Sequence, residues 1–199
     1  MSEPTFSWKS VIFESLFVVM GVVLAFIGNE YRSSLQEEQK ARKAIKSILF
    51  EIENNKSAIE VSLKYHEYLR DTLFSFMRNN PSANSAPEIQ VFEKGFISPA
   101  ELLSTAYQTA LATDVLNNYK YELVLEIGNL YAKQQSYDHQ KARVGDIIYK
   151  ALYTEGRIKM LANYRNLLSV ILTFTYKERE LIKAYEATIE DLTEYRTIE

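Results

Sequence analysis

The first apolar stretch of the chain carries hydrophobic residues at consecutive positions, and therefore on every side of a helix. Residues 11–27 read VIFESLFVVMGVVLAFI, with Glu14 as the one ionisable residue, and the run from Leu16 to Ile27 is unbroken. A helix on the surface of a soluble domain has one apolar stripe, whereas a membrane-spanning helix is apolar all round. The pattern therefore predicts a transmembrane helix near the N-terminus.

Aromatic residues extend this predicted span at both ends. Seventeen residues of helix cover about 25 Å, less than a hydrocarbon core of about 30 Å. Trp8 and Tyr31 are 23 positions apart, about 34 Å along a helix, and both residue types favour the membrane interface. We therefore expect a short tail over 1–7, a span over 8–31 with Trp8 and Tyr31 as interfacial anchors, and a helical soluble domain over 32–199.

Two other interpretations of the apolar run are a cleaved signal peptide and the buried helix of a soluble protein. The residues FIGNEYR place large side chains where a signal peptidase needs small ones, and Glu3 accompanies Lys9 ahead of the run. A buried helix fits less well because the apolar residues form no single stripe. A transmembrane helix is the preferred interpretation.

The basic residues near the span predict its orientation. Lys9 alone precedes the apolar run, whereas five basic residues follow it by position 46: Arg32, Lys40, Arg42, Lys43 and Lys46. Positive residues flank the cytoplasmic end of most membrane helices. We therefore expect a single-pass protein of the bacterial inner membrane with its helical domain in the cytoplasm.

One face of the predicted span combines a carboxylate with small residues. Glu14, Gly21 and Gly28 are seven positions apart, and Ala25 lies beside them. Small residues let membrane helices approach closely, and polar side chains hydrogen-bond across such contacts. We predict a helix contact through Glu14, Gly21, Ala25 and Gly28, made with a second copy or a partner membrane protein. The alternative is that Glu14 reaches the nearer interface beside Ser10.

Beyond the span, apolar residues keep a helical spacing. No Pro or Gly occurs from Glu30 to Asn80, so the span is expected to continue into a long helix, with Asn54 and Asn55 as its weak point. Its predicted buried positions are Ile45, Ile48, Leu49, Ile52, Ile59, Leu63, Leu69, Leu73, Phe76 and Met77. The breaker segment NPSANSAPE predicts a loop within 80–97.

Three more helices are expected in the second half of the chain. A capping box at 98–101 predicts one that runs to about Ala112, and the next is expected over 121–153, with a turn at 154–156. The last is expected over 159–195, with a heptad seam at Leu161, Tyr164, Leu168, Ile171, Thr175, Glu178, Ile182, Tyr185, Ile189 and Leu192. The predicted fold is all-α: the transmembrane helix continues into a long helix, and an antiparallel helical bundle follows.

Composition narrows the candidate chemistry. The 199 residues include no Cys, two His and a net charge of −3, which argues against disulfides, thiolate metal sites and nucleic-acid binding. His66 and His139 are far apart in sequence, so we expect no catalytic, cofactor or metal site, with His66 beside Tyr65 or Tyr68 and His139 on the surface. The pairs Glu51/Glu53 and Glu190/Asp191 are expected in solvent. Seven tyrosines are expected to line the core: Tyr107, Tyr119, Tyr121, Tyr131, Tyr149, Tyr153 and Tyr164.

Two segments carry a family resemblance. VVMGVVLAFIGNEY and LLSTAYQTALATDVLNNYKYELVLEIGNLY resemble a widespread bacterial family of uncharacterised single-span membrane proteins. The resemblance implies a membrane anchor and a helical domain, and it implies no activity or catalytic residue.

These patterns predict a non-enzymatic, membrane-anchored helical module that assembles with itself or another membrane protein as a scaffold, sensor or regulator. The alternative is a subunit of an oligomeric channel or ion-coupled complex that uses Glu14, of which a membrane-active defence effector is a variant. A membrane-tethered enzyme is the third interpretation. The expected partners are the lipid bilayer and a protein, with no nucleic acid and no cofactor.

Overall fold

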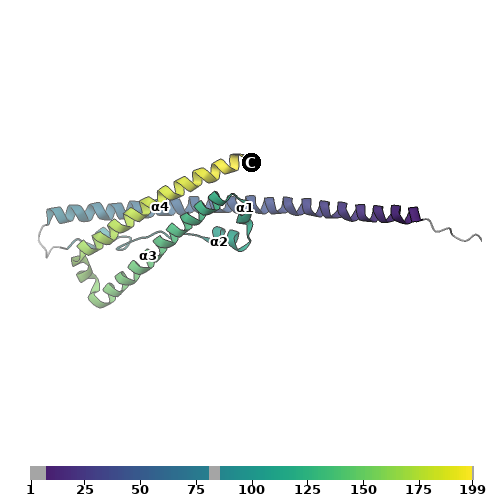
Figure 1. Cartoon of the computed structure of the whole chain (residues 1–199). Coiled ribbons are helices and arrows are strands. Elements are labelled where there is room, and N and C mark those ends of the chain that lie inside the picture. The colour runs from purple at the N-terminus through teal and green to yellow at the C-terminus, as the bar shows by residue number, and fades with distance from the viewer. Residues whose placement is uncertain (1–7, 81–85, 199) are drawn as a thin grey trace, which may run out of the picture. The chain divides into compact units, whose positions relative to one another are not determined.

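A computed structural model describes residues 8–80 and 86–198, so the expected tail over 1–7 and part of the expected loop lie outside the described residues. The elements in chain order are α1 (Trp8–Asn79), η1 (Ile89–Phe92), α2 (Thr105–Ala112), η2 (Val115–Asn118), α3 (Tyr121–Ala162) and α4 (Tyr164–Ile198) (Figure 1). The fold is all-α, as the sequence predicts. Contacts divide the chain into one unit that ends at Lys43 and a second that begins at Ala44.

The first unit consists of the N-terminal half of α1. This half contains an apolar stretch long enough to cross a membrane, and no part of that stretch is buried. Every described side chain from Phe13 to Lys40 is exposed, on all sides of the helix. The expected weak point at Asn54 and Asn55 is wrong, because α1 continues through both residues.

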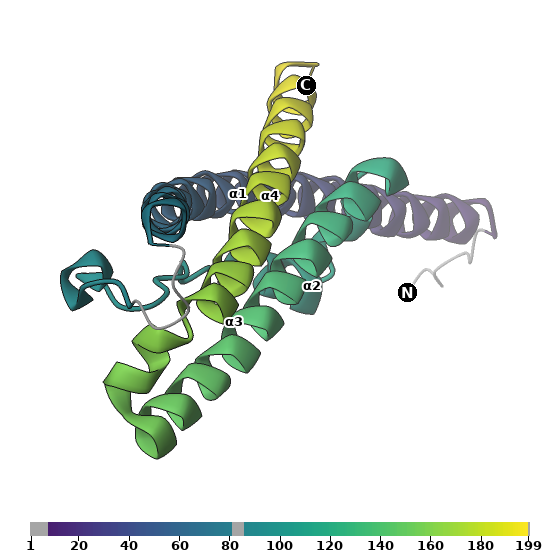
Figure 2. The same cartoon turned by 90° about the vertical axis from the view of Figure 1, so that its left-hand side faces the viewer.

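The second unit is built from the rest of α1 together with α3 and α4. Hydrogen bonds join Glu51 to Tyr131 and Asn55 to Gln134, at nearly the same offset in number, so α3 runs parallel to α1. Bonds from Tyr137 to Glu178 and from Tyr185 to Gln134 show that α4 runs antiparallel to α3. The two helices lie side by side in both views (Figures 1 and 2).

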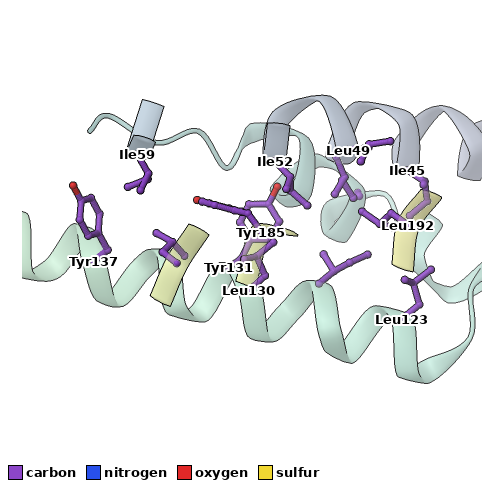
Figure 3. Close-up of a cluster of buried hydrophobic side chains, with 14 of the residues drawn as sticks. Ile45, Leu49, Ile52, Ile59, Leu123, Leu130, Tyr131, Tyr137, Tyr185 and Leu192 are labelled. Carbon is purple, nitrogen blue, oxygen red and sulfur yellow. The ribbon is translucent and has the colours of Figure 1, made fainter. Parts of the chain in front are cut away.

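The core of the second unit lies where these helices face one another. Ile48, Ile52 and Ile59 of α1 are fully buried, at the spacing of one helix face. Figure 3 shows α1 residues such as Ile52 opposite α3 residues such as Leu130. All ten predicted core positions of α1 are buried or half-buried, and every residue of the predicted α4 seam is too, including Thr175 and Glu178.

The predicted helix start at Ser98 is wrong. Residues 97–104 form no helix, and α2 begins at Thr105, although it ends at Ala112 as expected. The backbone of this stretch is hydrogen-bonded to side chains from α1 and α3, and these bonds replace the helical ones. The predicted start of α4 is also wrong, since Lys159 belongs to the end of α3 and α4 begins at Tyr164.

The predicted turn at 154–156 appears as a break within α3. Gly156 has φ 77° and ψ 166°, a backbone conformation that glycine adopts without the steric cost of a side chain.

Two of the tyrosines expected in the core, Tyr131 and Tyr164, are buried. The prediction is wrong for Tyr121, Tyr149 and Tyr153, which are exposed. Tyr65 and Tyr137 are buried tyrosines that the prediction missed, whereas the buried Tyr185 belongs to the predicted seam of the last helix.

Candidate functional site

Four polar side chains of α1 lie within the buried face of the helix. Glu51, Asn55, Ser62 and His66 are at most 5% exposed. Their intervals of four, seven and four residues place them on one side of the helix, among the core isoleucines. Buried polar groups are costly unless they are hydrogen-bonded, so the partners of these four residues define the candidate site.

At the C-terminal end of this row, Ser62 and His66 form a cluster with Tyr137 of α3 and Glu178 of α4. His66 Nδ1 lies 2.9 Å from Glu178 Oε1 and 3.0 Å from Oε2. Tyr137 donates its hydroxyl proton to Oε1 over 3.0 Å and accepts the N–H of Ala100. His66 and Glu178 are both 0% exposed, so the carboxyl group depends entirely on these protein donors.

The backbone N–H of Ser98 fixes the proton position on the ring of His66. This N–H donates to His66 Nε2 over 3.1 Å. Nε2 must therefore present a lone pair, and the proton of the neutral ring lies on Nδ1, from which it donates to Glu178. His66 thus connects the loop backbone to α4.

The hydroxyl of Ser62 has one proton and two short oxygen contacts. Its Oγ lies 2.7 Å from the carbonyl oxygen of Ser98 and 2.8 Å from Glu178 Oε1. This single proton can be donated to either oxygen, so Ser62 connects the carbonyl group of Ser98 to the carboxyl group of Glu178.

Asn55 and Gln134 hold the next part of the loop. Asn55 Nδ2 donates to the carbonyl oxygen of Leu103 over 2.7 Å, and its Oδ1 accepts the N–H of Leu103 over 2.8 Å. Gln134 Nε2 donates to the same carbonyl oxygen, and Gln134 Oε1 accepts protons from Asn55 and Tyr185. One loop residue is thereby bound on both backbone groups.

Glu51 binds the first turn of α2. Its Oε2 accepts the N–H of Ala106 over 2.8 Å, and Oε1 accepts the N–H of Tyr107 over 3.4 Å and the hydroxyl proton of Tyr131 over 2.6 Å. The first N–H groups of a helix have no partner within the helix, and a carboxylate there is favourable. The prediction that Glu51 is solvated is therefore wrong, while Glu53, Glu190 and Asp191 are exposed as expected.

These contacts share one target, the chain from Gly95 to Tyr107, which we name the clamped segment. Tyr65 adds a bond to the carbonyl oxygen of Gly95, and Lys141 adds one to that of Ala100. As residue numbers in the clamped segment rise, the numbers of their partners on α1 fall from Tyr65 to Glu51. The segment is therefore antiparallel to α1. Side chains of α1 and α3 thus supply hydrogen bonds that a regular element would make within its own backbone, and side chains of α4 bond to these partners in turn.

The residue types of a hydrolase triad are present, but their order differs. In a triad the imidazole lies between nucleophile and carboxylate and accepts the nucleophile's proton. Here Ser62 contacts Glu178, and His66 Nε2 is occupied by the N–H of Ser98. The burial of Ser62 and His66 also closes them to substrate. The arrangement holds the clamped segment and does not activate a nucleophile.

Burial controls the ionisation of the tyrosines in this interior. It raises the pKa of Tyr131, Tyr137 and Tyr185 well above the ordinary tyrosine value. The carboxyl groups of Glu51 and Glu178 raise the pKa of Tyr131 and Tyr137 further, because a phenolate beside them would be repelled. These three hydroxyls therefore act as hydrogen-bond donors at neutral pH.

The predicted membrane residues all lie on the first half of α1. Glu14, Ala25, Trp8 and Tyr31 are exposed, the last two at 72% and 68%. A side chain built at Gly21 or Gly28 would meet nothing within 4 Å. Helix contact through this face and interfacial anchoring by Trp8 and Tyr31 stay predictions.

The two histidines differ in environment. His139 is exposed, as expected, whereas His66 is fully buried, with its ring centroid 6.1 Å from that of Tyr65 and 5.3 Å from that of Phe174. The sequence signal for the missed site was the spacing of polar residues on α1 within an apolar face, since exposed residues have no reason to keep that face.

Comparisons with protein-family models, curated proteins and solved structures each gave no match.

Proposed function

We propose that the protein is a non-enzymatic, membrane-anchored helical module that assembles with itself or with another membrane protein. The observation that carries the proposal is the first half of α1, whose apolar side chains are exposed in every direction. Burial of that surface in lipid is strongly favourable, and the backbone of a helix satisfies its own hydrogen bonds there.

The interior of the second unit supports a structural role for its polar groups. Glu51, Asn55, Ser62 and His66 all bind the clamped segment or its immediate partners. A general acid, base or nucleophile must instead reach a substrate. The polar groups instead hold the clamped segment in place, which fits a scaffold, sensor or regulator better than an enzyme.

Charge in the middle of the apolar stretch is expected to release the protein from membranes. An aspartate at the centre of a membrane helix costs about 2.5–3.5 kcal/mol. The double substitution Val19→Asp and Val23→Asp should therefore abolish insertion. Extraction of isolated membranes at alkaline pH measures the change, with the wild-type chain expected to stay in the pellet at its full mass.

The matched control is Val61→Asp, at a valine of the second unit that is 62% exposed. This control should stay in the membrane pellet with the wild type. If the doubly substituted chain also remained in the pellet, or if the wild type lacked its first thirty residues, the anchor proposal would be wrong.

Assembly through the small-residue face is expected to depend on Glu14 and Gly21. A leucine at Gly21 fills the surface through which a second helix would approach, and Glu14→Leu removes the polar contact. We expect the variants to show a smaller assembly than the wild type in mild detergent, measured by light scattering with the detergent mass subtracted. Val23→Phe, on the opposite face of the helix, adds bulk and should leave the assembly unchanged.

Unchanged mass for both Glu14→Leu and Gly21→Leu would refute assembly through this face while leaving the anchor intact. The same preparations test the channel alternative. Ion flux in liposomes that Glu14→Gln alters would favour a channel subunit over a scaffold.

A further inference from the structure

The outer surface of the second unit has a groove between α3 and α4 of about 630 Å³. Its polar lining comes from both helices and includes Gln135, Ser136, His139, Arg143, Thr173 and Lys177. Small-molecule sites commonly have volumes of about 300–1,000 Å³, so the groove has room for a ligand larger than an inorganic ion.

The groove is basic in character. Arg143 and Lys177 are cations, His139 lies one helical turn from Arg143, and no residue of the lining carries a carboxyl group. Lys177 Nζ donates to Ser136 Oγ over 3.2 Å, which orients the ammonium group and leaves it further protons to donate. Amide and hydroxyl groups complete a set made largely of hydrogen-bond donors.

Some basic residues elsewhere in the unit have a carboxylate within 4 Å. Lys141 pairs with Glu101 at 2.9 Å, Lys56 pairs with Glu186 at 3.0 Å, and Arg179 pairs with Glu67. Within the described part of the chain, neither Arg143 nor Lys177 has a carboxylate within 4 Å. In a chain with a net charge of −3, two cations that face one groove without a counter-charge mark a local positive site.

We propose that this groove binds a phosphate group carried by a small organic molecule. A guanidinium donates to two phosphate oxygens at once, and an ammonium group adds a point charge. Lys177 and Arg143 would neutralise the phosphate, while Gln135, Gln140 and Thr173 bind the polar body attached to it. The inference is independent of the membrane anchor and gives the second unit a ligand.

The test is a titration of the full chain in nanodiscs of zwitterionic lipid, with ribose 5-phosphate as probe and ribose as its uncharged counterpart. We expect saturable binding of ribose 5-phosphate by calorimetry and none of ribose. The double substitution of Arg143 and Lys177 by glutamine should weaken binding at least tenfold. Lys183→Gln, at an exposed lysine of α4 paired with Glu180, should bind as the wild type does.

A second arm separates the two sources of a phosphate group. If a lipid headgroup occupies the groove, nanodiscs that contain phosphatidic acid should stabilise the wild type against unfolding more than they stabilise the double variant. If a free phosphate occupies it, soluble ribose 5-phosphate should have this effect instead. The double variant must keep the wild-type circular dichroism spectrum. Equal affinity of the double variant and the wild type, or the lack of saturable binding in both arms, overturns the proposal.

Discussion

Replacing Glu178 with leucine is expected to destabilise the second unit by about 2–6 kcal/mol, because it leaves two buried hydrogen-bond donors unsatisfied at a cost of about 1–3 kcal/mol each. The substitution removes the acceptor of His66 Nδ1–H and of the Tyr137 hydroxyl, and both donors are buried. Water cannot replace the lost acceptor in a closed, packed interior. The loss is comparable to the whole stability of many small domains.

Urea unfolding of the full chain in mild detergent, followed by circular dichroism, measures this effect. Glu180→Leu is the matched control, since Glu180 is exposed on the same helix, and it should change stability by no more than about 0.5 kcal/mol. Glu178→Gln should lose less than the leucine variant, because the amide can still accept one proton and donate to Ser62. If the leucine variant matched Glu180→Leu, the cluster would have no structural role.

The sequence predicts the regular parts of this fold well because their signals are local. The apolar spacing of α1 and α4 identifies the buried faces, and the lack of Pro and Gly after Glu30 predicts the unbroken helix. Gly156 marks the break in α3 through its own conformational freedom. Each of these inferences depends on residues within about one or two helical turns.

The clamped segment could not be predicted in this way. Ser98 and Glu101 match a capping box, yet the N–H of Ser98 binds His66 and the Glu101 carboxylate pairs with Lys141. The partners of the clamped segment lie 30 to 56 positions away in sequence, so tertiary contacts override the local preference. The paired acids at 51 and 53 likewise look alike in sequence, and only the helix face separates buried Glu51 from exposed Glu53.

The candidate site shows the same division between local and distant information. The row of Glu51, Asn55, Ser62 and His66 can be recognised on one face of α1, but Glu178 appears in the α4 seam only as an interruption. Its pairing with His66 spans 112 positions, and no local pattern encodes that distance. A polar residue within an otherwise apolar seam can nevertheless signal a buried network, as Glu178 shows, whereas the buried Thr175 bonds to the backbone of its own helix.

Raising the pH above about 10 is expected to unfold the second unit cooperatively. Burial raises the pKa of Tyr131, Tyr137 and Tyr185 in the folded state above the ordinary value of about 10. Their contribution to stability is therefore complete below pH 10 and falls as the pH rises toward the folded-state pKa, because only the unfolded chain loses these protons. Each tyrosine costs about 1.4 kcal/mol per pH unit, and three cost about 4 kcal/mol.

Absorbance of tyrosinate and circular dichroism, recorded on the same samples, should show these buried tyrosines ionising in the step that loses helix. Tyr131→Phe should lower the pH dependence of the unfolding free energy by about 1.4 kcal/mol per pH unit, since the proton of one buried tyrosine is gone. Tyr153→Phe is the control, because Tyr153 is 89% exposed and its ionisation is not linked to folding. If all the tyrosines instead titrated near pH 10 with the helices intact, the three buried hydroxyls would not be sealed in the interior, and the clamped segment would be open to water.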